Sequence, residues 1–567
     1  MTYARFALFA CALAVLTDCT CRKTEPLNNP PPEPRVVPLK APSENWLKGV
    51  PEQDTGSPKH GGTLIIRMPT EPAGLTRIHD RYADGLMVRT MVGTVYQTLA
   101  TVNHQNPLAP LNPELAEKWA VSADGRQLTV QLKQGLEFHS GSPFSSADLL
   151  AELAVIRDAK NPTVGMRSAL GDIEVIDAPD AQTLTVKWKK AEPLSVRTLL
   201  AGLPVMSAQS LQGDFETLKV HREPDGTGPY RVTEWKEGES LTLTHIEESR
   251  AGNRAWLQSI ELRFVKDETA AVQRWQSGEF DLMTRIPPQV FKAIEEPTAE
   301  NQWAITGYRR LIVPENTYSL IVWNVRNPLL KDVRVRQALA AAYPGDVVAK
   351  HVDLGFEKRI NCPYWPEGKS CDPSHPPPLF DLNRAKTLLD EAGATDTDGD
   401  GIRELKKQPL KLQILSNAAS SKLAKLLPLY AEQLKLVGIE LEINAVEPTA
   451  FVAKLRAHEF DGAPMSWSNL DVMTDVYDLF HTSQAKDGKN YGGFSDADLD
   501  RELLAVRVEG DLEQRELRER LVHGLIDDRQ PALFLSTRPS LDAAKTRVHG
   551  LQPSVAWYDL LNVWVDP

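Results

Sequence analysis

An α/β fold is predicted by three patterns in this sequence. Residues 410–414 alternate between apolar and polar positions, as in a half-buried strand, and residues 439–443 repeat the alternation. Between them, apolar residues recur at helical spacing over residues 423–437, and Gly438 follows as a helix stop. Strict alternation also marks residues 260–264. A strand, a helix and a second strand in this order predict a parallel sheet that is covered by helices.

Upstream of this unit, the sequence predicts strands that are separated by turns. The predicted strands are residues 62–66, 119–121, 128–132, 230–235, 241–244, 260–264 and 320–324. Asp124-Gly125 is typical of a hairpin turn, and residues 138–143 form a second turn. Ser145 and Asp148 then have the spacing of a capping box, which predicts a helix over residues 149–156.

Two turn motifs are more specific than the strands around them. Pro229 fixes φ within residues 226–230 and the glycines at 226 and 228 free it, so a sharp chain reversal is predicted. A Ser-Gly-Glu-Phe-Asp turn follows at residues 277–281. Further along, a helix is predicted to open at residues 332–339, and Gly393 ends an amphipathic helix.

The order of these motifs resembles the extracytoplasmic solute-binding proteins of peptide-type ABC importers. In that family a Gly-Thr-Gly-Pro-Tyr turn leads a sheet, and a Ser-Gly-Glu-x-Asp turn closes the next helix. The other matching segments are Leu115–Trp119, Ser122–Gly125, Phe138–Asp148 and Asp332–Ala338. Two departures are Ser140, where the family usually has Asp, and residues 344–346, which replace the usual Asp-Arg and predict an early helix end. The resemblance runs from about Gly61 to Trp564.

The resemblance implies an α/β, periplasmic binding protein-like class II fold, with two α/β lobes, a hinge between them and an extra smaller domain in addition. The chain is expected to cross between the lobes near Tyr318–Asn324 and near Phe534–Thr537. The expected division is a signal peptide at 1–19, a tether at 20–60, lobe I at 61–101, an extra α+β domain at 102–205, lobe I again at 206–322, lobe II at 323–535 and a return to lobe I at 536–567.

The first residues predict export from the cytoplasm. An apolar run at residues 6–16 is too short to span a bilayer but suits the core of a signal peptide. The segment that ends at Cys19 resembles a lipoprotein cleavage box, in which this Cys receives the lipid, although Asp18 is unusual before it. Cys11 and Cys21 are weaker candidates, and a plain secretory signal is the alternative.

Net charge, proline content and cysteine positions bear on the partners, the tether and the cross-links of the protein. A net charge of −12 argues against nucleic acid as a partner, because phosphate binding needs clustered Lys and Arg. Nine prolines between residues 26 and 58 predict a stiff, extended tether.

Outside the cytoplasm, Cys362 and Cys371 can form a disulfide across a loop-like segment. A metal site that includes His375 is the alternative, although the spacing of the three residues is poor for metal binding. A monomer without a cofactor is expected.

Residues 396–404 place carboxylates at alternate positions before glycine, as an EF-hand loop does for calcium. The twelfth position, where an EF-hand has a bidentate Glu, is Lys407, so the segment is not an EF-hand. The solute-binding family often carries this segment as a surface hairpin, and bound calcium is the alternative. No metal site is expected.

The candidate ligand site lies at residues 464–471, where a strand is expected to end and a loop to begin. In peptide-binding members of the family, the backbone around such a Trp pairs with the peptide, and an Asp three residues later holds its α-amino group. Here that position is Leu470, and the nearest acids are Asp471 and Asp475. Asp471 is equally well explained as a helix N-cap. The ligand-binding residues expected are Ser466, Trp467, Ser468, Asn469 and Asp471.

The function implied by the resemblance is capture of a peptide or similar solute outside the cytoplasmic membrane and its delivery to an ABC permease, without catalysis. A secreted hydrolase that uses His139 or the carboxylates of residues 396–404 is the alternative, but the usual nucleophile, zinc-protease and phosphate-loop motifs are absent from the sequence. Two further alternatives keep the fold: a membrane-bound sensor as the partner, or a non-peptide ligand such as a metal chelate.

Overall fold

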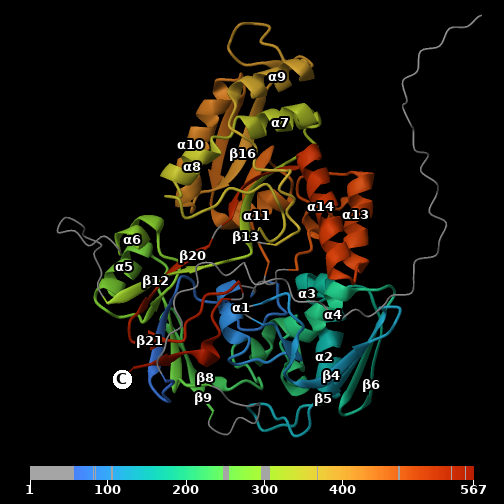
Figure 1. Ribbon diagram of the computed structural model, residues 1–567, viewed down its shortest axis with the longest axis vertical. Helices are drawn as coiled ribbons and strands as arrows, with labels where there is room; N and C mark the ends of the chain where they lie inside the picture. Colours follow the sequence, from blue (N-terminus) through green and yellow to red (C-terminus); the bar gives the residue numbers. More distant parts are fainter. Residues whose placement is uncertain are drawn as a thin grey trace, which may run out of the picture.

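The computed structural model describes residues 57–80, 82, 85–103, 106–246, 255–294, 307–366, 368–469, 473–537, 539–555 and 557–566. Cys19, the signal peptide and the tether up to residue 56 lie outside the described residues. Two large sheets form an upper and a lower part of the molecule, and a third sheet lies beside the lower one (Figure 1). The chain therefore has the two-lobed α/β architecture that the sequence predicts.

The seven-stranded sheet is the centre of the lower lobe, which we call lobe I. Its strands, in spatial order, are β12 (Tyr308–Val313), β20 (Ser540–Lys545), β11 (Leu282–Met283), β1 (Thr63–Met68), β10 (Ser259–Phe264), β9 (Ser240–His245) and β8 (Tyr230–Lys236). Strand β1 runs parallel to β10 and β11, and the remaining pairs are antiparallel. The predicted strand at 260–264 thus lies inside the sheet, where both of its edges are bonded.

The turn at residues 226–230 leads into β8, as predicted, but its glycines are needed for a different reason. Neither glycine has a positive φ; a Cβ added at Gly226 would lie 2.0 Å from the Val95 carbonyl oxygen, and one at Gly228 would lie 2.2 Å from that of Thr94. The Gly228 amide donates a hydrogen bond to the Val95 carbonyl at 2.9 Å. Close approach of two backbones therefore requires these glycines.

A four-stranded antiparallel sheet stands beside lobe I. It consists of β4 (Ala116–Val121), β5 (Gln127–Leu132), β7 (Thr183–Trp188) and β6 (Ile173–Asp180). Helix α2 (Ser146–Arg157) begins at the predicted capping box, in which both reciprocal bonds between Ser145 and Asp148 are present. One buried apolar cluster contains residues of this sheet, of α2 and of the seven-stranded sheet, so the two sheets share a core.

The five-stranded sheet is the centre of the upper lobe, which we call lobe II. Its spatial order is β17 (Glu440–Val446), β16 (Lys411–Asn417), β18 (Gly462–Ser468), β13 (Thr317–Trp323) and β19 (Ala532–Thr537). The predicted β-α-β unit is β16, α10 (Ser421–Lys435) and β17, and the two strands pair in parallel along their whole length. Helices α7 (Val333–Ala341), α9 (Leu382–Ala392) and α10 pack on one face, and α13 (Ala497–Val508) and α14 (Leu512–Arg529) on the other.

The remaining elements are short. The other α-helices are α1 (Gly85–Met91), α3 (Val164–Ala169), α4 (Pro193–Arg197), α5 (Glu268–Gln276), α6 (Pro288–Ala293), α8 (Gly345–His351), α11 (Pro448–Arg456) and α12 (Tyr477–Phe480). Three two-stranded pairs are β2 (Ala100–Thr101) with β3 (Asn112–Pro113), β14 (Glu404–Leu405) with β15 (Gln408–Pro409), and β21 (Val548–His549) with β22 (Trp564–Val565). Among the described residues, no helix is both long enough and apolar enough to cross a membrane.

The chain passes between the two large sheets twice. The first crossing, residues 314–316, links β12 to β13, and the second, residues 538–539, links β19 back to β20. The first crossing comes earlier than the boundary expected after residue 322, because the whole of β13 pairs with β18 and β19 in lobe II. Strand β19 likewise continues to Thr537, two residues past the expected end of lobe II.

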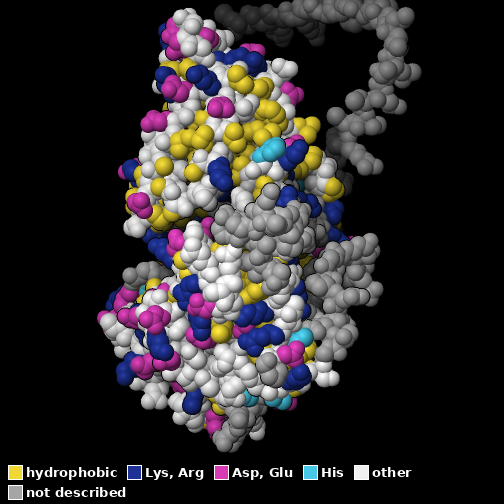
Figure 2. Space-filling view, turned by 90° about the vertical axis from the view of Figure 1, so that its left-hand side faces the viewer, with side chains coloured by type: hydrophobic (Ala, Val, Ile, Leu, Met, Phe, Trp, Pro, Cys, Tyr) yellow, Lys and Arg dark blue, Asp and Glu magenta, His cyan; other side chains and the backbone are white. Residues whose placement is uncertain are grey.

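The surface differs between the lobes on one side of the molecule. Figure 2 shows apolar side chains gathered over the upper lobe, whereas acidic and basic side chains are interspersed over the lower lobe. Exposed apolar side chains in the upper lobe include Val347 of α8 and Leu436 after α10. On this face the charge of the lower lobe is mixed, as on an ordinary protein surface.

Cys362 and Cys371 are joined by a disulfide, with a Cα–Cα distance of 5.7 Å. The loop that they close lies against α14. Ser370 donates a hydrogen bond from its hydroxyl to the Glu519 carboxylate, and the Arg520 guanidinium donates to the Lys369 carbonyl at 2.6 Å. The disulfide thus closes the loop on itself, and the hydrogen bonds to α14 fasten it to lobe II.

We expect the unfolded, unreduced protein to leave Cys362 and Cys371 unlabelled by a thiol reagent, as read from their peptides by mass spectrometry. Labelling of both residues after reduction is the control, and full labelling of both before reduction would contradict the disulfide. Replacing both with Ser should lower the free energy of unfolding by about 2.5–3 kcal/mol on the chain-entropy model, because the loop is short. Denaturant unfolding measures this change.

Candidate functional site

The two large sheets present the same kind of edge to each other. At the edge of lobe II next to the crossings lie the carboxyl ends of β16, β17, β18 and β19 and the amino end of β13. The corresponding edge of lobe I has the carboxyl ends of β1, β10, β11 and β12 and the amino end of β20. Ligands of open α/β sheets bind beyond carboxyl strand ends, so the space between these edges is the candidate cleft.

Hydroxyl side chains follow the cleft edge of lobe II across three strands. Thr317 Oγ1 and Ser468 Oγ lie 2.6 Å apart, and Ser319 Oγ and Ser466 Oγ lie 3.4 Å apart. Ser536 stands opposite Ser319 on β19. Ser466 and Ser468 are exposed, so this row offers small groups that can both donate and accept hydrogen bonds.

Strand β18 separates from β16 just before the cleft. Within the described residues the two strands pair at a single register position, Gly462 with Ile414, whereas β18 pairs with β13 along its whole length. Pro464 follows two residues later. Because proline has no N–H, it cannot continue the ladder towards β16. The expectation that a strand ends here and a loop begins is wrong, because β18 starts at Gly462 and stays paired with β13 as far as Ser468.

Beyond Pro464, no strand of the described residues pairs with β18 on the side that faces away from β13, and this side is its free backbone edge. The Asn469 amide donates to the Asn316 carbonyl at 2.8 Å, which identifies 469 as a residue bonded towards β13. Bonding alternates along an antiparallel pair, so the N–H and C=O groups of Ser466 and Ser468 point away from β13, towards the edge that β16 has left. An extended chain can add to such an edge as a further strand.

Trp467 lies on the opposite face of β18 from the two serines and is half-buried against the cluster under α13 and α14. Its Nε1 donates to Asn469 Oδ1 at 3.1 Å, and the Lys489 ammonium lies 5.3 Å from its ring centroid. Trp467 thus holds the strand to the core and orients the Asn469 amide. Among the described residues, the buried Nδ2 of Asn469 has no hydrogen-bond acceptor.

Asp471, the acid expected to hold an amine, lies outside the described residues, as does Leu470. Asp475, the next acid, is already used: Arg507 Nε donates to its Oδ2 at 2.6 Å, and the Tyr477 amide donates to its Oδ1 at 2.9 Å. Asp475 therefore fixes the start of α12 and part of α13. The structure removes it from the candidates for amine binding.

A charged cluster that the sequence analysis missed lies at the end of the hydroxyl row. Lys422 Nζ is 2.6 Å from Glu357 Oε2 and 2.9 Å from Asp353 Oδ1, and Ser536 Oγ donates to Glu357 at 2.5 Å. Two carboxylates face one ammonium, so the cluster carries a net negative charge beside the cleft. Its members come from α10, β19 and the loop after α8, and no local sequence pattern joins them.

The facing edge of lobe I contains arginines. Arg89 Nη1 lies 3.4 Å from Glu315 Oε1 at the first crossing. Arg285 is exposed, has a positive φ of 52°, and donates its backbone amide to Asp542 Oδ1 at 2.9 Å. Burial raises the pKa of Asp542 to about 6, although the Tyr558 hydroxyl also donates to it. These residues tie the crossing to the sheet.

His139, considered above as a catalytic residue, has a structural position. Its Nε2 lies 2.9 Å from the Gly228 carbonyl oxygen, and its backbone amide donates to the Gly226 carbonyl at 2.8 Å. Burial lowers the pKa of His139 and so favours the neutral ring. The side chain connects the turn at 138–143 to the turn at 226–230.

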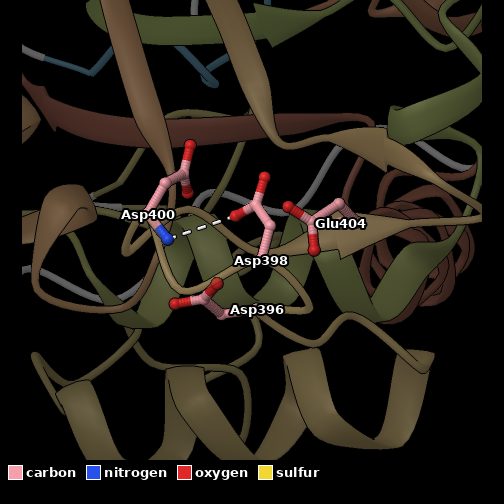
Figure 3. Close-up of side chains that lie close together, drawn as sticks. All are labelled: Asp396, Asp398, Asp400 and Glu404. Atoms are coloured by element: carbon pink, nitrogen blue, oxygen red, sulfur yellow. Dashed lines mark hydrogen bonds between the residues drawn. The ribbon is translucent and has the colours of Figure 1, made fainter.

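The carboxylates of residues 396–404 lie close together (Figure 3). Asp396, Asp398, Asp400 and Glu404 each offer an oxygen within 4.8 Å of the others. Asp396 accepts hydrogen bonds from the amides of Gly399 and Gly401, at 2.7 and 3.0 Å. The segment precedes the amino end of β16, the edge opposite the cleft. Backbone amides that close a turn account for this arrangement, and it adds nothing to the cleft.

Comparison with known proteins identifies the family. The family model for the bacterial extracellular solute-binding proteins, family 5 Middle, matches residues 110–490. The oligopeptide-binding protein AppA of Bacillus subtilis is 26% identical over 506 residues, which cover 85% of this chain and 88% of the relative. Di/tripeptide-binding protein 2 of Pseudomonas aeruginosa is 24% identical, over 87% of this chain and 92% of the relative.

Solved structures show the same fold. AppA of Bacillus subtilis in complex with a nonapeptide has a TM-score of 0.77 and 23% sequence identity, covering 90% of this chain and all of that one. NikA of Brucella suis in complex with Fe(III)-EDTA has a TM-score of 0.76 and 21% identity, covering 89% of this chain and all of that one. With its motifs, its sheets and this family match in agreement, the chain belongs to the bacterial extracellular solute-binding proteins of family 5.

Proposed function

We propose that this protein captures peptides outside the cytoplasm, as an extended chain added to the free edge of β18, and delivers them to an ABC permease without chemical change. The observation that carries the proposal is the backbone edge of Ser466 and Ser468, which β16 leaves unpaired after Pro464. The oligopeptide- and di/tripeptide-binding relatives support the ligand class.

Backbone pairing suits a protein that must accept many peptides. Main-chain hydrogen bonds are the same for every sequence, so they give affinity without reading side chains. The hydroxyl row and the buried Asn469 Nδ2 add donors and acceptors that adapt to different ligands. These contacts with the bound peptide then favour the closed arrangement of the two lobes over the open one.

Replacing Ser466 with Pro tests the free edge. We expect the affinity for an equimolar mixture of random nonapeptides to fall about tenfold, because a ligand carbonyl loses its donor at a cost of about 1–3 kcal/mol. The β13 side of the strand should be unaffected, since the 466 amide is not bonded to it. Isothermal titration measures the affinity, and thermal unfolding checks the fold.

Ser466→Ala is the matched control, because it removes the hydroxyl and keeps the amide; it should bind nearly as the unaltered protein does. Equal affinities of the Pro and Ala variants would count against strand addition. A parallel titration with Ni(II)–L-histidine covers the chelate alternative, since NikZ of Campylobacter jejuni was solved with that ligand. Binding of this chelate without binding of peptides would replace the peptide proposal.

We further propose that Asp471 pairs the ligand α-amino group. In a closed cleft, Asp471→Asn removes a charge-assisted bond and leaves the ammonium poorly compensated, which should weaken binding by about 2–5 kcal/mol. An N-acetylated peptide should bind both proteins equally. If Asp471 only caps a helix, Asn caps as well and neither stability nor affinity should move.

Titration of both proteins with free and N-acetylated versions of one bound peptide decides the question. Where the free peptide binds both proteins equally but better than its acetylated form, the amine is read elsewhere, and Glu357→Gln becomes the next variant because of the net negative cluster around Lys422. Equal affinity of both proteins for both peptides would mean that the protein does not bind the ligand α-amino group.

We also propose that the protein acts as a monomer in the cell envelope, attached through a lipid on Cys19. The signal-like run at residues 6–16 and the proline-rich tether support this arrangement. Cys19→Ser should move the protein from the membrane to the soluble periplasmic fraction, as read by fractionation and immunoblot. Unchanged membrane attachment of this variant would contradict the anchor.

A further inference from the structure

The loop closed by the disulfide contacts both lobes through two neighbouring side chains. Tyr364 is 1% exposed and packs into the lobe II cluster beneath α13 and α14. Trp365, 9% exposed, packs instead with Val555 and Leu108, which lie on the lobe I side of the molecule. Neighbouring residues of an extended segment point to opposite sides, and Pro363 and Pro366 favour that extended backbone here.

The lobe II end of this contact is held rigidly. The Asp372 amide donates to His523 Nδ1 at 3.0 Å, and the opposite ring nitrogen of His523 lies 2.7 Å from the Asn361 carbonyl oxygen, so one side chain of α14 fastens both ends of the loop. The Cys362–Cys371 bond joins the same two ends covalently. Trp365 therefore cannot move far unless lobe II moves with it.

The lobe I end is also braced. Val555 is 2% exposed and lies in a turn closed by reciprocal backbone bonds between Ser554 and Trp557, at 3.0 and 2.9 Å. The segment of Leu108 is fixed by Arg197 Nη2, which donates to the Pro107 carbonyl at 2.8 Å. Two braced surfaces thus meet through one indole ring, and the contact depends on how the lobes sit relative to each other.

We propose that Trp365 is a positioning residue for ligand retention: its contact with Val555 and Leu108 stabilises the closed arrangement of the lobes, and the Cys362–Cys371 bond holds the ring in place. Hinge opening separates the lobes and exposes these apolar groups to water, which is unfavourable. An interaction that increases the closed population also raises the apparent affinity of a ligand that binds the closed state. The link to ligand retention rests on the proposed function, but the effect on closure does not.

Small-angle X-ray scattering of the full chain tests the proposal without any ligand. Relative to the unaltered protein, Trp365→Ala should raise the ratio of open to closed molecules about tenfold, the equivalent of about 1.4 kcal/mol, and so increase the radius of gyration. The double variant Cys362→Ser/Cys371→Ser should shift the ratio in the same direction. Trp365→Phe, which keeps an aromatic ring, should restore most of the closed population.

Leu108→Ala is the matched variant on the opposite lobe. Leu108 is only partly buried, so the variant should fold normally, and it should open the protein without changing the disulfide loop. Combined with Trp365→Ala it should add little, because both variants remove one shared contact. Thermal unfolding of each variant separates opening from loss of the fold.

Each outcome decides for or against the contact. Opening by both Trp365→Ala and Leu108→Ala supports it; opening by Trp365→Ala alone indicates a local change in the loop and overturns it. Equal radii of gyration for all variants, with and without the random nonapeptide mixture, also overturn it. If the peptide mixture fails to bind any protein but the ligand-free radii differ as expected, the peptide proposal fails and the role of Trp365 in closure stands.

Discussion

The two short crossings at residues 314–316 and 538–539 are the constraint on which the rest of the structure depends. Each is too short to pass around a sheet, so the two sheets must meet at the edges where β12 ends, β13 begins, β19 ends and β20 begins. Strand direction then brings carboxyl strand ends of both sheets to the same space. The cleft, its hydroxyl row and the hinge all follow from this connection.

Much of the fold could be predicted from local sequence. The β16-α10-β17 unit, the capping box of Ser145 and Asp148 and the turn before β8 depend on residues close together in the chain, and so their patterns are visible in it. The lobe boundary was misplaced because residues 320–324 were recognised only as an apolar strand, and an apolar pattern does not show which sheet a strand joins. The strand end expected at residues 464–471 was wrong, because a segment with few apolar residues can still be held in a sheet by backbone pairing with one neighbour, here β13.

The candidate site was less predictable for the same reason. Glu357 and Lys422 are 65 residues apart, and Ser536 lies still further along the chain, so nothing local joins them. The glycines at 226 and 228 were recognised, but their need comes from the neighbouring Val95 and Thr94 backbone rather than from φ. Which distant residues come together depends on how the sheets pack, and no local pattern in a single sequence predicts it.

The free edge of β18 has a consequence for the molecule in solution. Unpaired N–H and C=O groups attract any extended chain, including a strand of another copy, and long exposed edges are sites of aggregation. In this protein the edge is short, because it begins only after Pro464 and ends with β18 at Ser468. So short an edge can pair with an extended peptide but offers few backbone groups to a strand of a second copy.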